Sequence, residues 1–201
     1  MARAAKITLS DKELSIASDE GWILTKWEVM DTVYDLLGTC VEPIRKRCAA
    51  LQSIPSEAWQ RPPKISRGEN YRRLPYAILD FPRLFTGDDI FAMRTMFWWA
   101  HFFSVTLHVS GKYLPLISDR ILDERDGRGD DVFFCIQEDP WQHHFEENNY
   151  RQLADVDRQT LIRQIKSHGF VKLALKYDLK QWNQMPALLE EGIGRLASFL
   201  D

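Results

Sequence analysis

Residues 171–180 read VKLALKYDLK, and this stretch decides the fold class. Apolar side chains occupy every second position from Val171 to Leu179, and Lys172, Lys176 and other small or polar residues lie between them. A period of two predicts a strand with one buried face and one polar face. Residues 103–109 (FSVTLHV) repeat the pattern. Parallel strands are usually apolar on both faces, so the two segments favour a mainly antiparallel sheet in an α+β fold.

Two shorter segments bring the predicted sheet to about four strands. Residues 76–81 are apolar except for Asp80 and lie between two prolines, a position typical of an edge strand. Residues 132–137 are apolar enough for a central strand. We interpret residues 53–74, which contain three prolines and few apolar side chains, as a loop.

A long helix is predicted near the N-terminus, where apolar side chains recur in alternating steps of four and three residues across residues 23–51. Gly38 and Pro43 lie inside this stripe, and the proline predicts a kink or break near Thr39. A second apolar stripe runs beside the first. The resulting wide face favours packing onto a sheet over a two-stranded dimer zipper, which remains the alternative. The stripe consists of Ile23, Trp27, Met30, Tyr34, Leu37, Val41, Ile44, Cys48 and Leu51.

Several further helices complete the prediction of a single globular domain over residues 1–201. Ser10 and Glu13 have capping-box spacing, and Asp157 is expected to cap a helix that ends at Gly169. Other helices are expected at 86–100, at 113–122 and from Pro186 onward.

The composition indicates a soluble cytoplasmic protein. The net charge is −3, which makes nucleic-acid binding unlikely. Three cysteines without CxxC spacing favour reduced thiols. The longest apolar stretch, residues 96–109, is too short to span a bilayer, so we expect no membrane association.

A basic segment at residues 61–83 is the first candidate site. It has six basic and two acidic side chains, with tyrosines interleaved. Guanidinium groups offer a fork of hydrogen-bond donors, and tyrosine adds a hydroxyl or a stacking face. We therefore expect Arg72, Arg73, Tyr76 and Arg83 to bind an anionic small molecule.

The second candidate group is four histidines, His101, His108, His143 and His144. The last two lie in an acidic segment, residues 119–147, where ten acidic side chains outnumber three basic ones. Adjacent histidines diverge in any regular structure, and no metal-ligand motif is complete, so we predict no metal site. The acidic segment and the basic segment are expected to meet within the domain or across a homodimer.

No Walker loop, dinucleotide fingerprint or nucleophile elbow is present, and no cofactor is expected. The sequence therefore favours a binding or interaction domain, with an anionic small molecule or a protein as partner. The alternative is an enzyme with a noncanonical His/carboxylate site, with or without a metal, that acts on an anionic substrate. A third interpretation, RNA binding through residues 61–83, is opposed by the net charge of −3.

Overall fold

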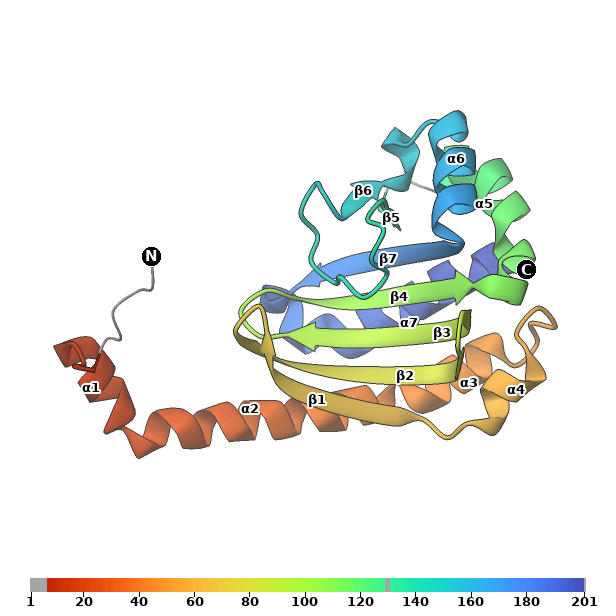
Figure 1. Cartoon of the computed structure of the whole chain (residues 1–201). Coiled ribbons are helices and arrows are strands. Elements are labelled where there is room, and N and C mark those ends of the chain that lie inside the picture. Colours follow the sequence, from red (N-terminus) through yellow and green to blue (C-terminus); the bar gives the residue numbers. More distant parts are fainter. Residues whose placement is uncertain (1–6, 129–130, 201) are drawn as a thin grey trace.

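The computed structural model describes residues 7–128 and 131–200, and its centre is an antiparallel sheet (Figure 1). Within those residues the sheet has seven strands in the order β1-β2-β3-β4-β7-β5-β6. The α+β class with a mainly antiparallel sheet is confirmed, whereas the prediction of about four strands is wrong. The strands are β1 Lys64–Tyr71, β2 Leu74–Thr86, β3 Asp89–Trp98, β4 Phe102–Ser110, β5 Phe133–Cys135, β6 Tyr150–Gln152 and β7 Phe170–Asp178.

Helices precede the sheet, connect its strands and close the chain. The α-helices are α1 Asp11–Ala17, α2 Glu20–Thr39, α3 Val41–Cys48, α4 Ser56–Gln60, α5 Pro115–Arg128, α6 Arg158–His168 and α7 Met185–Ala197. Short 3₁₀ helices are η1 Gly111–Tyr113, η2 Leu153–Asp155, η3 Leu179–Gln184 and η4 Ser198–Leu200. The predicted caps are present, because Ser10 and Glu13 form a capping box and Asp157 accepts a hydrogen bond from the Thr160 N–H.

The long N-terminal helix breaks where the proline predicts. Helix α2 ends at Thr39, Cys40 caps it, and α3 starts at Val41. Pro43 lacks the N–H that would bond to the Thr39 carbonyl, so one helix cannot continue through this point. The apolar stripe then faces the sheet from Met30 to Cys48, as intramolecular packing requires.

Strand β1 is a correction, because residues 53–74 were expected to be a loop. Residues 64–71 pair with β2, and the hairpin turn between them consists of Arg72 and Arg73. Two-residue hairpin turns usually contain Gly, Asn or Asp, which tolerate positive φ angles. Without those residues the sequence carries no signal of a hairpin here.

Strand β3 is a second correction, because residues 86–100 were expected to be a helix. Thr86 pairs with Asp89 across the two-residue turn Gly87–Asp88, so the polar residues taken for a helix start form a hairpin turn. Strand β3 is buried on both faces. Such an apolar run has neither the period of a helix nor that of a half-buried strand, so the pattern does not distinguish them.

Helices cover one face of the sheet and form the main core. Helices α2, α3 and α7 lie along this face (Figure 1). Phe91, Phe97, Phe103 and Leu173 point toward them and are at most 2% exposed. This layer fixes the strand positions, and with them the position of every turn at the sheet ends.

The opposite face is covered over β4 and β7 by the segment between β5 and β6, residues 136–149 (Figure 1). The predicted polar face on β4 and β7 is therefore not in water. Ser104, Thr106, His108 and Lys172 are all buried, and Lys172 is only 1% exposed. The Lys172 ammonium donates hydrogen bonds to the carbonyls of Pro140 and Gln142, which ties the segment to the sheet. Burial lowers the pKa of Lys172 to about 8.

Across residues 7–128 and 131–200, every helix is too short or too polar to cross a membrane.

Candidate functional site

A cleft of about 520 Å³ opens at the end of the sheet that carries the β1–β2 and β3–β4 turns. We call it the hairpin-end cleft. Four parts of the chain build it: the two turns, the 136–149 segment and the end of β7. Its lining residues are Arg72, Trp98, His101, Phe102, His144, Phe145, Glu146, Lys176, Tyr177 and Asp178.

Arg72 reaches the cleft from the β1–β2 turn, where the backbone is strained. The φ angles of Arg72 and Arg73 are 50° and 69°, values that side chains with a Cβ rarely adopt. Strain of this kind persists only where the surroundings enforce it, and it concentrates at functional sites. Here the paired strands on both sides hold the turn and aim the Arg72 guanidinium at the 136–149 segment.

The next side of the cleft is aromatic and comes from the β3–β4 turn. The His101 ring stacks on Trp98, with centroids 3.6 Å apart and planes 13° apart. Ala100, between them in the chain, has a φ of 62°. The Trp98 indole N–H donates to the Tyr71 carbonyl at 3.3 Å, which joins the two turns. Phe102 completes this aromatic wall by edge contacts to Trp98 and Phe145.

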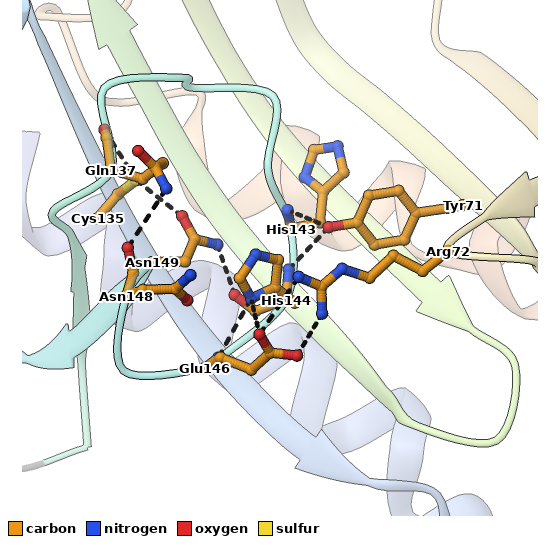
Figure 2. A network of polar contacts seen from close by, with 9 residues as sticks. All are labelled: Tyr71, Arg72, Cys135, Gln137, His143, His144, Glu146, Asn148 and Asn149. Atoms are coloured by element: carbon orange, nitrogen blue, oxygen red, sulfur yellow. Dashed lines mark hydrogen bonds and ion pairs between the residues drawn. The ribbon is translucent and has the colours of Figure 1, made fainter. Parts of the chain in front are cut away.

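The 136–149 segment is anchored to the hairpin by one hydroxyl group. The Tyr71 hydroxyl accepts hydrogen bonds from the backbone N–H groups of His143 and His144, at 2.7 and 3.0 Å (Figure 2). The Asn149 amide donates to the His144 carbonyl from the other side (Figure 2). These bonds hold the segment in a fixed position, so His144 and Glu146 are presented to the cleft by ordered backbone.

His144, Glu146 and Arg72 form the polar centre of the cleft (Figure 2). Both terminal nitrogens of Arg72 donate to the Glu146 carboxylate. The Glu146 N–H donates to His144 Nδ1 at 3.4 Å, which assigns the proton of a neutral His144 to Nε2. Burial, followed by the charge of Arg72, lowers the pKa of His144, so His144 is neutral at pH 7. The Arg72 hydrogen bonds lower the pKa of Glu146.

Lys176 is the second cation of the cleft. Its ammonium lies 5.6 Å from the centre of the Phe145 ring. Among the described residues no carboxylate forms an ion pair with it. The nearby Asp178 carboxylate already accepts a hydrogen bond from the Lys180 N–H at the start of η3. Lys176 therefore offers an ammonium group without a direct ion pair beside an aromatic surface, in a cleft that the Asp178 carboxylate also lines.

The structure brings three of the eight predicted site residues together in this cleft: Arg72, His101 and His144. His143 lies directly behind it, with its ring 5.4 Å from the Tyr71 ring and Nε2 3.5 Å from an Arg94 nitrogen. That arginine forms a buried ion pair with Asp80.

The other four predicted residues lie elsewhere. Arg73 is in the hairpin turn outside the cleft lining, and Tyr76 packs edge-on against Tyr71. The Arg83 guanidinium donates to the Pro62 carbonyl at 2.9 Å, far along β2 from the cleft. His108 borders a second hollow near the other end of β4.

The surroundings of His108 are apolar and cationic. Its ring contacts Trp141 and Phe170, and its Nε2 atom is buried without a hydrogen-bond partner. Burial, with Lys172 and Arg94 nearby, lowers the pKa of His108 to about 3. His108 is thus neutral at physiological pH and separate from the hairpin-end cleft.

No three His, Cys, Asp or Glu side chains in the described ranges converge in a way that could hold a metal ion. The four histidines of the metal hypothesis are divided between the cleft, the layer behind it and the second hollow. Cys40, Cys48 and Cys135 are unpaired and buried. Burial raises their thiol pKa values, to about 12 for Cys40 and about 11 for Cys48, which disfavours a thiolate nucleophile.

Sequence reasoning missed Trp98, Phe102, Phe145, Lys176 and Tyr177 as site residues. Trp98 was assigned to a buried helix and Tyr177 to the core face of its strand. Lys176 was placed correctly on a polar strand face, and its exposed position at the end of β7 distinguishes it from the buried Lys172. No local pattern joins these residues, because only the strand order brings them together.

No protein-family model matches this chain, and the comparisons with curated proteins and with solved structures found no match.

Proposed function

We propose that this chain is a binding domain for an anionic small molecule that carries a flat ring, and that the hairpin-end cleft is its site. The observation that carries the proposal is the juxtaposition of Arg72 and Lys176 with an aromatic wall in one hollow of about 520 Å³. Pockets of this size hold small molecules, with apolar surface for affinity and a few polar groups for orientation.

The cleft offers distinct partners for the two parts of such a ligand. Trp98, Phe102 and Phe145 present apolar ring surface. Lys176 and the Nε2–H of His144 supply a charge and a hydrogen-bond donor for the anion. Arg72 adds its donors when Glu146 releases it. Their ion pair is half exposed, and exposed pairs contribute little to stability, so the exchange of partner costs little.

The test is calorimetric titration with phenyl phosphate, inorganic phosphate and benzyl alcohol. Phenyl phosphate is expected to bind most tightly, because it alone offers both ring and charge. Lys176→Met should weaken its binding about tenfold by removing one charged donor. Glu146→Gln should tighten it by freeing Arg72 from its competing carboxylate.

Lys46→Met is the matched control, since it removes an equally exposed lysine from α3, on the helix side of the sheet. The proposal fails if phenyl phosphate does not bind, or if Lys176→Met and Lys46→Met bind it as tightly as the unchanged protein.

One contact favours the alternative of an enzyme that acts on an anionic substrate. His144 Nδ1 lies 3.5 Å from a Glu146 oxygen, and when the ring takes up a proton on Nδ1 the two groups would form a His/carboxylate pair of the kind that performs acid–base catalysis. Turnover of p-nitrophenyl phosphate that is lost in His144→Gln would establish this function. Binding without turnover would instead support the function of a binding domain.

We further propose a cytoplasmic location, which the three reduced, buried cysteines support.

A further inference from the structure

The N-terminal helices extend beyond the sheet and carry apolar side chains that no other part of residues 7–128 and 131–200 covers (Figure 1). We call residues 9–27 the arm. It consists of α1 and the first turns of α2, and within α2 burial starts only at Met30. The large apolar side chains of the arm, with their exposed fractions, are Leu9 59%, Leu14 56%, Ile16 43%, Trp22 51%, Ile23 39%, Leu24 56% and Trp27 40%.

Seven of the eleven large apolar side chains that are exposed among the described residues lie on the arm. Monomeric proteins rarely expose contiguous apolar patches larger than a few hundred Å², and larger ones mark interfaces. Ile23 and Trp27 continue the same heptad stripe that packs on the sheet through Met30 and Leu37. The C-terminal part of the stripe is therefore buried within the chain, and its N-terminal part is exposed and available to a partner.

Charge indicates which partner fits. Helices α1 and α2, residues 11–39, carry seven acidic and two basic side chains. The segment 61–83 carries six basic and two acidic side chains. The arm leaves the body beside this basic segment, because Lys26 pairs with Glu69 and the Arg67 guanidinium lies 5.8 Å from the Trp27 ring.

We propose that the arm binds a second copy of this chain in a twofold homodimer. In a twofold arrangement the same patch meets itself, so each apolar arm packs on the other, and the acidic helices α1 and α2 of one copy face the other copy's basic segment. A stable dimer buries about 800 Å² on each partner, and tryptophans such as Trp22 and Trp27 commonly dominate such interfaces. This assigns a surface to the homodimer that the sequence offered as an alternative.

The test is sedimentation of the full chain across a concentration series. The expected result is a dimer that dissociates on dilution and on addition of salt. Leu24→Glu places a charge in the apolar patch without disturbing the fold, since Leu24 is 56% exposed, and should weaken dimerisation at least about 100-fold. The matched control, Phe85→Glu, changes a residue that is 38% exposed on β2 and should leave the dimer intact.

Charge exchange tests the arrangement separately. Glu20 and Glu28 are exposed on α2, and Lys64 and Arg73 are exposed in the basic segment. The double variant Glu20→Lys/Glu28→Lys should weaken self-association. The double variant Lys64→Glu/Arg73→Glu should weaken it as well. A mixture of these two double variants should restore the dimer. Three results would overturn the proposal. The chain could remain monomeric over a 100-fold range of protein concentration, the dimer could be unaffected by Leu24→Glu, or the mixture of the two charge variants could stay monomeric. None of these results depends on ligand binding in the hairpin-end cleft.

Discussion

At the scale of single residues, the buried polar groups behind the cleft are as informative as those that line it. His108 on β4 and Lys172 on β7 lie beneath the 136–149 segment, and His143 of that segment is close to both. Their pKa values are all lowered, mainly by burial, and each cation nearby adds to the effect. Protonation of either histidine would add a positive charge to this buried layer. Acidification is therefore expected to destabilise the packing of the 136–149 segment on the sheet.

His108 gives a specific pH dependence. Its pKa is about 3 in the folded protein and 6.5 in an unfolded chain, so the unfolded chain binds the proton first as the pH falls. Stability is therefore present above pH 6.5 and is lost on acidification toward pH 3. Acidification from pH 7 to pH 5 should lower the free energy of unfolding by about 2 kcal/mol through His108. Urea unfolding at the two pH values measures it.

In His108→Gln the pH dependence should shrink by that amount, because the side chain no longer titrates. His168→Gln is the control, since it removes a histidine that borders the same hollow and keeps His108. An unchanged acid loss in His108→Gln would show that His108 does not carry the effect.

At the scale of secondary-structure elements, helix α7 supports the cleft from behind. A Cβ at Gly192 would lie 2.0 Å from the Tyr177 hydroxyl, whereas a Cβ at Gly194 would meet nothing closer than Arg47 at 3.7 Å. Tyr177 also lines the hairpin-end cleft. The absence of a side chain at Gly192 therefore allows close packing of α7 on β7 and sets the position of a cleft residue.

The two glycines should respond in opposite directions to alanine. Gly192→Ala should destabilise the protein by about 1–3 kcal/mol, because Tyr177 must shift from a packed position. Gly194→Ala should be neutral or stabilise by up to about 1 kcal/mol, since alanine favours a helix and has space here. Thermal unfolding of both variants measures the difference, and an equal effect at both positions would contradict the close packing.

The elements also show what the sequence could predict. The class, β4, β7, the α2–α3 break and the α6 caps follow from local periods and capping residues. Strand β3 does not, because burial on both faces erases its period. Strand β1 does not, because two arginines form its turn. In the cleft, Arg72, His101 and His144 follow from residue chemistry. Trp98, Phe145 and Lys176 join them only through strand order, which no local pattern encodes.

At the scale of the whole molecule, the faces and ends of the sheet differ in what packs on them. One face packs on helices and supplies the core, and the 136–149 segment covers the other face over β4 and β7 (Figure 1). The turns at one end form the hairpin-end cleft, and the arm extends beyond the sheet with its apolar surface uncovered. The proposed ligand site and the proposed apolar dimer contact thus lie on different surfaces, and the basic segment 61–83 is the part of the chain that both proposals use.

The central claim is that the hairpin-end cleft binds the anionic ligand. The most direct measurement is an amide ¹H–¹⁵N NMR titration with phenyl phosphate, with the Trp98 indole N–H as an additional probe. The largest shifts are expected at Arg72, His101, Phe145, Lys176 and the Trp98 indole. Shifts that saturate instead around His108 and Trp141, at the second hollow, or the absence of saturable shifts, would contradict the account.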